Sequence, residues 1–282
     1  MERGHTFQEA LTYYGLERTI YRISVSRHAE HFVLKGGIFL YAIFDRNYGR
    51  ATTDVDLLAR RISNSSIEMK EVFREIFAQD IDDALTFDVE SVSVEDITEF
   101  KEYHGLHVSA VGYLGRTRIP VSIDIGFGDV IYPDAVKIDF PVILDMEAPR
   151  VNAYSLESSI AEKLEAIIHN GYLNSRYKDF YDIYILTGKY SFDFRDMKSA
   201  ATETFQNRGT LMSMSTAAFG DEFVQDPLHR TRWNAFLKKK RALVQISLEE
   251  TISGVKAFAE PLLEDTNTYA SKWNPENRVW EC

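Results

Sequence analysis

The sequence predicts an α/β (α+β) protein, in which a small mixed sheet with flanking helices precedes a mainly helical C-terminal lobe. Residues 32–58 combine a short apolar strand, a helix-like segment and a second strand. Residues 105–127 form two segments separated by Gly115-Arg116, which is the spacing of a β-hairpin. From Ser155 onward, apolar residues recur at helical intervals. Strands followed by helices favour a sheet domain and then a helical one.

The N-terminal region is expected to contain helices around the first strands. Residues 6–31 carry apolar side chains at roughly helical intervals and predict one or two helices. Residues 66–78 predict an amphipathic helix, for which the polar run 64–66 offers an N-cap. Residues 80–90 are acidic and predict a loop, which leads into a strand at Ser91–Val94.

The most informative segment joins a Gly-Gly turn to a pair of carboxylates. A strand ending in Lys35 leads into Gly36-Gly37, and the strand after the next helix carries Asp54 and Asp56. Because strand side chains alternate faces, both carboxylates point the same way, and they repel unless a cation lies between them. Oxygen ligands at this spacing suit Mg2+ or Mn2+, and the glycines let backbone amides approach a phosphate beside the lysine. The alternative is an exposed strand end with solvated acids and a solvated lysine.

A third carboxylate is expected on the second strand of the hairpin. In Ile119–Phe127 the odd positions are apolar and form a core face, whereas Asp124 lies on the opposite face between small residues. We expect Asp124 to complete a metal site with Asp54 and Asp56; the alternative is a polar strand face turned to water. Asp129 is expected to lie past the strand, so we rank it below Asp124.

Residues 130–154 are expected to connect two domains. They contain three of the seven prolines and predict an extended connection with a strand at Pro141–Leu144. We place the boundary near Pro149, which divides the chain into a domain of residues 1–149 and a helical lobe of residues 150–282.

The first helix of the lobe begins near Ser155 and has one apolar stripe. At about 100° per residue, Lys163 falls beside that stripe, where it could reach into a cleft with its stem packed. Plain snorkelling of the lysine is the alternative. Glu162, Glu165 and His169 are expected on the outer face.

The next helix, Tyr177–Leu186, is apolar almost all round but carries Asp179 and Asp182 one turn apart on one side. Carboxylates on so apolar a helix are costly to bury without a partner. The candidate partners are Arg176, Lys178 and Lys163.

The C-terminal part of the chain predicts further helices, including Leu237–Ile246 and Leu248–Phe258, and a loosely ordered tail after Pro261. Its most basic stretch is 229–241. The cations there are interleaved with Trp233 and Phe236 and could hold an RNA backbone and stack a base. A charged outer helix face is the commoner explanation.

Composition restricts the class of protein. The formal net charge of -11 disfavours a protein that coats nucleic acid regardless of sequence, but it permits an enzyme with a local basic groove. No apolar run approaches the length that spans a bilayer, so we expect no membrane association. The only cysteine is Cys282, which excludes a disulfide within one chain. These features fit a cytoplasmic protein.

Taken together, the motifs resemble the AbiEii/AbiGii abortive-infection toxins of the nucleotidyltransferase superfamily. The first motifs are Leu-Lys-Gly-Gly at 34–37 and Arg-x-Thr-x-Asp-Val-Asp-Leu at 50–57, and the third acid lies in Ile-Asp-Ile-Gly-Phe-Gly-Asp at 123–129. The distal motifs are Glu-x-x-x-Ala-Glu-Lys-Leu at 157–164 and Arg-x-x-Asp-x-x-Asp at 176–182. One departure is Lys178 directly before Asp179, where the family often has an arginine.

The resemblance implies a sheet of the nucleotidyltransferase type and transfer of a nucleoside monophosphate from an NTP to an acceptor hydroxyl. The implied acceptor is RNA, with a tRNA end expected. The resemblance also implies a type IV toxin that an antitoxin protein counters.

The same resemblance places the site residues in a cleft between sheet and lobe. Asp54, Asp56 and Asp124 would hold Mg2+ or Mn2+ on one wall. Lys163 on the other wall would contact the phosphates, and Asp179 would assist chemistry or orient the lysine. The residues expected at the nucleotide are Lys35, Gly36, Gly37, Thr53 and Lys163.

Two other functions remain open from the sequence. Asp-x-Asp also binds metal–nucleotide complexes in sugar-nucleotide enzymes, so a phospho- or glycosyltransferase is one alternative. A nucleotide- or protein-binding module without turnover is the other.

Overall fold

The computed structural model describes residues 6–48, 52–97, 105–242, 244–264 and 271–282, which form two compact units. The first unit ends at Tyr154, and the second begins at Ser155 and also includes Val130–Asp134. The boundary that we expected near Pro149 therefore moves to Tyr154, because Arg150–Ala153 forms a strand of the sheet in the first unit.

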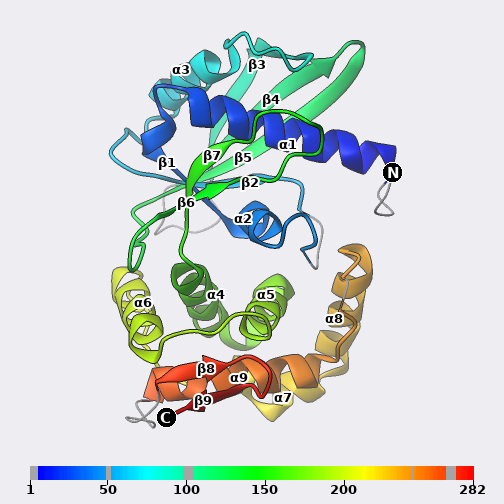
Figure 1. Ribbon diagram of the computed structural model, residues 1–282. Coiled ribbons are helices and arrows are strands. Elements are labelled where there is room, and N and C mark those ends of the chain that lie inside the picture. Colours follow the sequence, from blue (N-terminus) through cyan, green and yellow to red (C-terminus); the bar gives the residue numbers. More distant parts are fainter. Residues whose placement is uncertain (1–5, 49–51, 98–104, 243, 265–270) are drawn as a thin grey trace. The chain divides into compact units, whose positions relative to one another are not determined.

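The described part of the first unit contains a seven-stranded mixed sheet (Figure 1). Its strands are β1 Phe32–Lys35, β2 Val55–Ala59, β3 Leu85–Ile97, β4 Gly105–Leu114, β5 Thr117–Phe127, β6 Val136–Asp139 and β7 Arg150–Ala153. They lie in the order β3-β4-β5-β2-β1-β7-β6. Strand β2 is antiparallel to β1 and parallel to β5, so its residues lie at the centre of the sheet. The predicted mixed sheet is confirmed.

Three α-helices of this unit were predicted close to their observed bounds. They are α1 Phe7–Val25, α2 Gly36–Ile43 and α3 Ser66–Phe77, with a 3-10 turn at Ala29–His31. A capping box between Thr6 and Glu9 starts α1, and the Ser65 side chain caps α3. Helix α1 crosses the sheet (Figure 1) and lies so close to β5 that a Cβ at Gly15 would come within 2.6 Å of Ile119.

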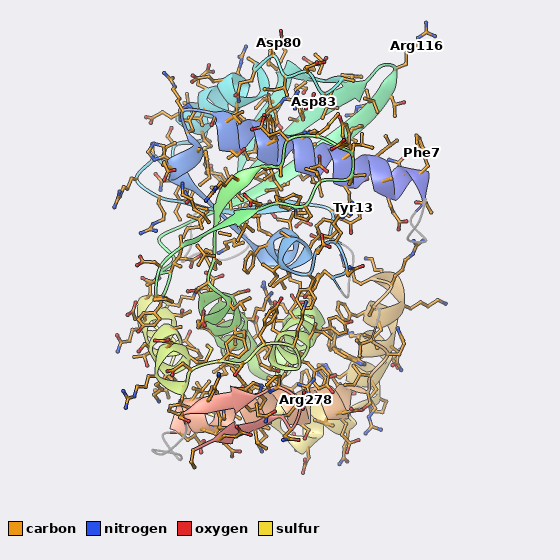
Figure 2. The ribbon with its side chains drawn as sticks, in the orientation of Figure 1. Phe7, Tyr13, Asp80, Asp83, Arg116 and Arg278 are labelled. Atoms are coloured by element: carbon orange, nitrogen blue, oxygen red, sulfur yellow. The ribbon has the colours of Figure 1, made fainter. Side chains whose placement is uncertain are left out.

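The predicted hairpin is confirmed in β4 and β5. Leu114 pairs with Thr117, and Arg116 projects from the tip of the hairpin (Figure 2). A two-residue connection determines the register of both strands, because each further step from the turn moves one residue along each of them.

The acidic segment 80–90, which we expected to be a loop, contains the start of β3. Leu85 and Phe87 are buried whereas Thr86 and Asp88 are exposed, so the alternation of a strand is present beneath the acidic composition. Asp83 lies against α1 (Figure 2), where it accepts hydrogen bonds from Arg22 and from the Leu85 amide. An acid that looked like a loop residue therefore helps to begin the strand.

The strand predicted at Pro141–Leu144 is wrong, since the chain forms β6 and β7 on either side of that segment. The backbone there is bound by side chains instead of by a neighbouring strand. Ile143 N–H donates to Glu17 over 2.7 Å, and the Val142 carbonyl accepts from Arg46 over 2.9 Å. The segment is only partly buried, with Leu144 51% exposed, so its apolar character marked neither a strand nor a core segment.

The described part of the second unit is mainly helical, as predicted. Its helices are α4 Leu156–Asn170, α5 Tyr177–Thr187, α6 Phe194–Asn207, α7 Asp221–Gln225, α8 Pro227–Lys239 and α9 Leu248–Glu264, with 3-10 turns at Gly171–Leu173 and Ala217–Phe219. Helix α4 packs against α5 and α6, and α5 packs against α9. Among the described helices of the whole chain, none combines the length and the apolar character that crossing a membrane requires.

The helix predicted at Leu237–Ile246 is wrong because α8 ends at Lys239. Arg241 adopts a left-handed conformation with φ of 49°, and the Ala242 amide donates back to the Leu237 carbonyl. This is a helix C-cap of the Schellman type, which most often contains glycine. Because no glycine marks the C-terminus of α8 in the sequence, the predicted helix extended past the observed end.

The tail predicted to be loosely ordered is structured where it is described. Pro261 lies inside α9, and β8 Lys272–Asn274 pairs with β9 Val279–Glu281. The indoles of Trp273 and Trp280 are buried and donate to the carbonyls of Thr187 and Phe258. Burial of two tryptophans anchors this hairpin to the helices.

Candidate active site

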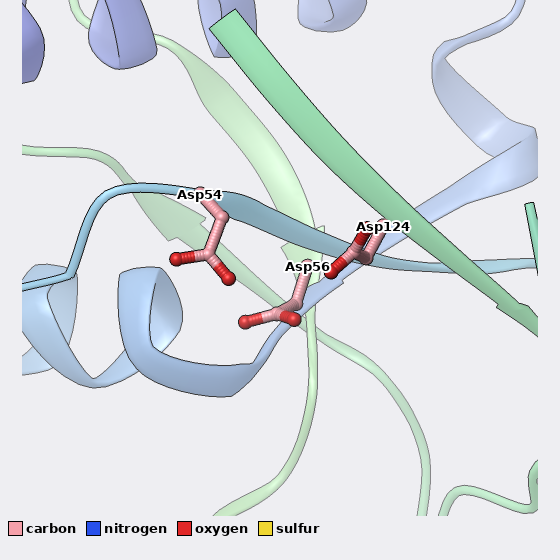
Figure 3. A group of neighbouring side chains, drawn as sticks. All are labelled: Asp54, Asp56 and Asp124. Atoms are coloured by element: carbon pink, nitrogen blue, oxygen red, sulfur yellow. The ribbon is translucent and has the colours of Figure 1, made fainter. Parts of the chain in front are cut away.

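Three carboxylates meet on one face of the sheet in the first unit (Figure 3). Asp54 directly precedes β2, Asp56 lies on β2, and Asp124 lies opposite Asp56 on the parallel strand β5. One oxygen from each of the three lies within 4.8 Å of the others, and all three residues are half-buried. We call this group the acid triad. The structure therefore brings together the three residues that we predicted as metal ligands.

The donor set of the acid triad fits a small divalent cation. All three donors are carboxylate oxygens, which Mg2+ and Mn2+ prefer. Two oxygens on opposite sides of a Mg2+ ion lie about 4.2 Å apart, at a bond length of about 2.1 Å each. Neighbouring oxygens of the same ion lie only about 3.0 Å apart. The three acid oxygens, which lie within 4.8 Å of one another, would therefore move closer by side-chain rotation to bind one ion. A bound cation would also relieve the repulsion among the three acids.

The Gly36-Gly37 turn supports Asp56. Gly36 has φ of 66°, and a Cβ at this position would come within 1.9 Å of Asp56 Oδ2. The Gly37 amide, in the first turn of α2, donates to the same oxygen over 3.3 Å. From the sequence, we predicted that these glycines let backbone amides approach a phosphate. The structure shows that they hold a carboxylate of the triad, and their contact with phosphate stays a prediction.

A second group of charges lies in the second unit and joins α4 to α5. Lys163 Nζ lies 2.8 Å from Asp182 Oδ2 and 3.5 Å from Asp179 Oδ1, and Arg176 Nε donates to Asp179 Oδ2 over 2.6 Å. The two acids are 1% and 0% exposed. We call these four residues the buried ion cluster. It confirms two of the proposed partners of the acids, Lys163 and Arg176.

The buried ion cluster holds Asp179 in its charged form. Burial alone would raise the pKa of Asp179, but the nearby cations Lys163, Arg176 and Lys178 outweigh burial, and the pKa lies below its ordinary value of 3.8. The acid triad and the buried ion cluster belong to different units. The cleft that we expected to join them stays a prediction.

The sequence of this chain matches the model of a known protein family. The family model described as Nucleotidyl transferase AbiEii toxin, Type IV TA system, matches residues 18–253. The chain belongs to this family. The matched range contains both the acid triad and the buried ion cluster. No curated protein matches the sequence significantly.

Two crystal structures from Helicobacter pylori are similar to this AbiEii-family chain. One is a "putative nucleotidyltransferase from H. pylori", with 16% sequence identity, a TM-score of 0.50, and coverage of 93% of this chain and 97% of that one. The other is JHP933, with 16% identity, a TM-score of 0.49, and coverage of 92% and 94%. At 16% identity, the likeness to the first of these two structures shows a shared fold.

Lys35 is already paired in this AbiEii-family chain. Its Nζ lies 2.7 Å from Asp129 Oδ2 and 3.4 Å from the Tyr154 hydroxyl, and its side chain is 16% exposed. Asp129 lies past the end of β5, as expected, yet it is less exposed than Lys35 at 7%. Asp129 therefore holds the lysine next to the Gly-Gly turn. A contact of Lys35 with phosphate stays a prediction.

Thr53 lies beside the triad and binds one of its acids. Both its amide and its hydroxyl donate to Asp54 Oδ1, over 3.2 Å and 3.3 Å. Its expected contact with a nucleotide stays a prediction. Two positions of the same motif, Arg50 and Ala51, lie outside the described residues.

The sequence interpretation missed His107. Its Nδ1 lies 2.6 Å from Asp124 Oδ1. The hairpin itself carried the signal, because equal steps outward from Leu114 and Thr117 arrive at His107 opposite Asp124. Residues directly opposite each other on antiparallel strands share a face, so the register alone places this histidine beside the third acid.

Glu165 is not on an outer face of α4, contrary to our expectation. It is 5% exposed and accepts hydrogen bonds from Arg208 over 2.9 Å and from Thr210 over 2.5 Å. Glu162 also pairs with Arg208, over 3.2 Å. The reason is that α6 packs on α4. Arg208 directly follows the last residue of α6 and so lies beside Glu165 on α4. His169 remains exposed, as expected.

The basic stretch 229–241 forms α8 and the turn after it. Trp233 is 1% exposed, and its indole donates to the Ile246 carbonyl over 2.8 Å. A base cannot stack on Trp233 without opening the second unit, so that part of the RNA hypothesis is wrong. Phe236 is half-buried, and stacking of a base on it stays a prediction. The charged side chains Arg230, Arg232, Lys238 and Lys239 are exposed, which is the commoner arrangement that we described for such a stretch.

Proposed function

We propose that this AbiEii-family chain transfers a nucleoside monophosphate from an NTP to an acceptor hydroxyl, with Asp54, Asp56 and Asp124 as the ligands of Mg2+ or Mn2+. The observation that carries the proposal is the convergence of three carboxylates on one sheet face within 4.8 Å. A like-charged group of this kind is what a metal–triphosphate complex needs, and membership of a nucleotidyltransferase family supports the reaction class.

The reaction would be an in-line displacement at the α-phosphorus. A bond forms between the acceptor oxygen and the α-phosphorus, the bond to the β-phosphate bridging oxygen breaks, and pyrophosphate leaves. Bound metal would neutralise the triphosphate and lower the pKa of the attacking hydroxyl. The Gly37 amide and Thr53 hold Asp56 and Asp54 in place for that purpose.

Lys163 is the cation that we assign to the triphosphate, with Lys35 as a second one. In the structure both are held by acids, Lys163 by Asp179 and Asp182 and Lys35 by Asp129. Such pairing keeps a flexible amine in one position before substrate arrives. Asp179 would thus act by orienting Lys163.

The biological setting of the proposal follows from the family. Its description as a type IV toxin–antitoxin system supports a cognate antitoxin protein as partner. We propose RNA as the acceptor, with tRNA as the first candidate, and action in the cytoplasm. The net charge of -11 means that binding of RNA would depend on local cations such as those exposed on α8.

The test is incubation with each α-labelled NTP, Mg2+ and total cellular RNA. Label should enter RNA with the intact protein and not with the Asp54→Ala/Asp56→Ala double variant. The labelled band then identifies the class of acceptor. If none of the α-labelled NTPs transfers label to RNA, this result would contradict RNA as the acceptor.

Mass analysis of the product separates the reaction classes. An added nucleoside monophosphate supports the proposal, whereas an added phosphate or sugar identifies a phospho- or glycosyltransferase. Binding of NTP and Mg2+ by calorimetry with no pyrophosphate released would identify a binding module.

A further inference from the structure

Each acid of the triad has a hydrogen-bond donor of its own. Thr53 donates to Asp54 and the Gly37 amide donates to Asp56, both through groups close to the chain's main motif. The donor to Asp124 is the side chain of His107, which comes from the neighbouring strand. His107 can therefore be changed without altering the backbone that carries the three acids.

The contact between His107 and Asp124 is short and has a defined direction. Nδ1 lies 2.6 Å from Oδ1, and the two side chains are 39% and 40% exposed. An ionised carboxylate only accepts hydrogen bonds, so Nδ1–H is the donor. The bond occupies one oxygen of Asp124 and restrains the rotation of the carboxyl group, which leaves the second oxygen to face an ion.

The geometry does not make His107 a ligand. Among the described residues, the group whose ligand atoms all lie within 4.8 Å of one another consists of the three acids and does not include the histidine. Ser109, the next residue on the same strand face, lies opposite Ser122 and not opposite an acid.

We propose that His107 is a positioning residue that orients Asp124 for binding of a divalent metal. The inference rests on the metal site of the proposed function. Residues that hydrogen-bond to metal ligands commonly contribute about 10- to 100-fold to metal affinity, because they hold the ligand in its binding orientation.

The experiment measures Mn2+ affinity directly and needs no substrate. Full-length protein is titrated with MnCl2, and free Mn2+ is followed by its electron paramagnetic resonance signal. His107→Ala should bind Mn2+ about 10-fold more weakly than wild type or worse. Ser109→Ala, on the same strand and the same face, should bind as wild type does. Thermal unfolding of each variant verifies that it is folded.

Two further variants separate positioning from a general effect on the strand. The amide nitrogen of His107→Asn lies close to the position of Nδ1 and should keep affinity within about threefold of wild type. The amide of His107→Gln lies nearer the position of Nε2 and should bind as weakly as the alanine variant. Both are polar and similar in size, so a difference between them reports the position of the donor.

The outcomes distinguish this inference from the proposed function. Suppose that the wild type binds Mn2+, that Asp54→Ala abolishes this binding, and that His107→Ala and His107→Gln leave it unchanged. This result would overturn the role of His107 and leave the metal site intact. Absence of Mn2+ binding by the wild type would overturn the metal site itself, and the inference with it.

Discussion

The acid triad and the buried ion cluster hold their carboxylates in different ways. The triad gathers three acids on a half-exposed sheet face, with hydrogen bonds from Thr53, Gly37 and His107. The buried ion cluster matches two buried acids of the second unit with two cations, Lys163, which is 10% exposed, and Arg176, which is 43% exposed.

The triad is a binding site alone, whereas the cluster is also a scaffold for the second unit, in addition to the proposed contact of Lys163 with the triphosphate. Three like charges close together raise the free energy of the protein until a cation joins them. Buried charges that are paired offset part of one another's desolvation cost, whereas removing one partner leaves an uncompensated charge in the interior. Substitutions in the triad should therefore affect activity alone, whereas substitutions in the cluster should affect stability as well as activity.

The largest expected effect is on activity, from Asp54→Ala. Losing a metal ligand should remove about 5 kcal/mol of transition-state stabilisation and slow nucleotidyl transfer by about 10⁴-fold. The melting temperature should stay the same or rise, because one of three repelling charges is gone. Labelled-NTP assays and thermal unfolding measure the two effects. An active Asp54→Ala protein would remove this acid from the site.

Lys163→Ala should have the largest effect on stability. It leaves Asp179 and Asp182 buried with one cation fewer, which typically costs about 3–5 kcal/mol in the free energy of unfolding. Urea unfolding followed by circular dichroism measures it. The matched control is Lys178→Ala, which removes an exposed lysine next to the same Asp179 and should cost below about 0.5 kcal/mol. Equal costs for the two would refute the scaffold role.

Gly36→Ala should affect both properties, to an intermediate degree. The new Cβ would displace Asp56, and a misplacement of about 1 Å can slow a reaction about 10²-fold. The left-handed backbone adds about 1–2 kcal/mol of strain. Gly115→Ala is the control, because Gly115 has φ of 60° with no atom within 4 Å of a new Cβ. It should show the strain alone and keep its activity.

The smallest effect is confined to acid and concerns Asp179. Its folded-state pKa lies below the ordinary 3.8, so the native state binds fewer protons than the unfolded state near that pH. The stability that it contributes is complete above about pH 4 and is lost as the pH falls further. Urea unfolding at a series of pH values should show a shallower acid loss for Asp179→Asn than for wild type. Parallel profiles would mean that the charge of Asp179 contributes nothing.

Local spacing explains why the acids of both groups could be identified from the sequence. Asp54 and Asp56 are two residues apart, and Asp124 alternates with apolar neighbours, so the period of a strand places each on its face. Asp179 and Asp182 are one helical turn apart, which places them side by side. The family match then confirmed the family that these motifs had suggested.

Elements without a local signal were the ones that we missed. The acidic composition of residues 80–90 hid the alternation of β3, and Arg241 took a left-handed cap where a glycine is usual. The backbone of the apolar run at Pro141–Leu144 is bound by the side chains of Glu17 and Arg46, which are distant in sequence.

The sequence by itself determined which residues share a face, because that depends on the period of a strand or helix and on the two-residue turn of the hairpin. Only the tertiary structure decided which partners those residues meet. Lys35 pairs with Asp129, Asp56 rests on Gly36, and Glu165 is covered by Arg208. Such contacts join segments that approach each other only when the chain packs, so nothing in the local pattern encodes them.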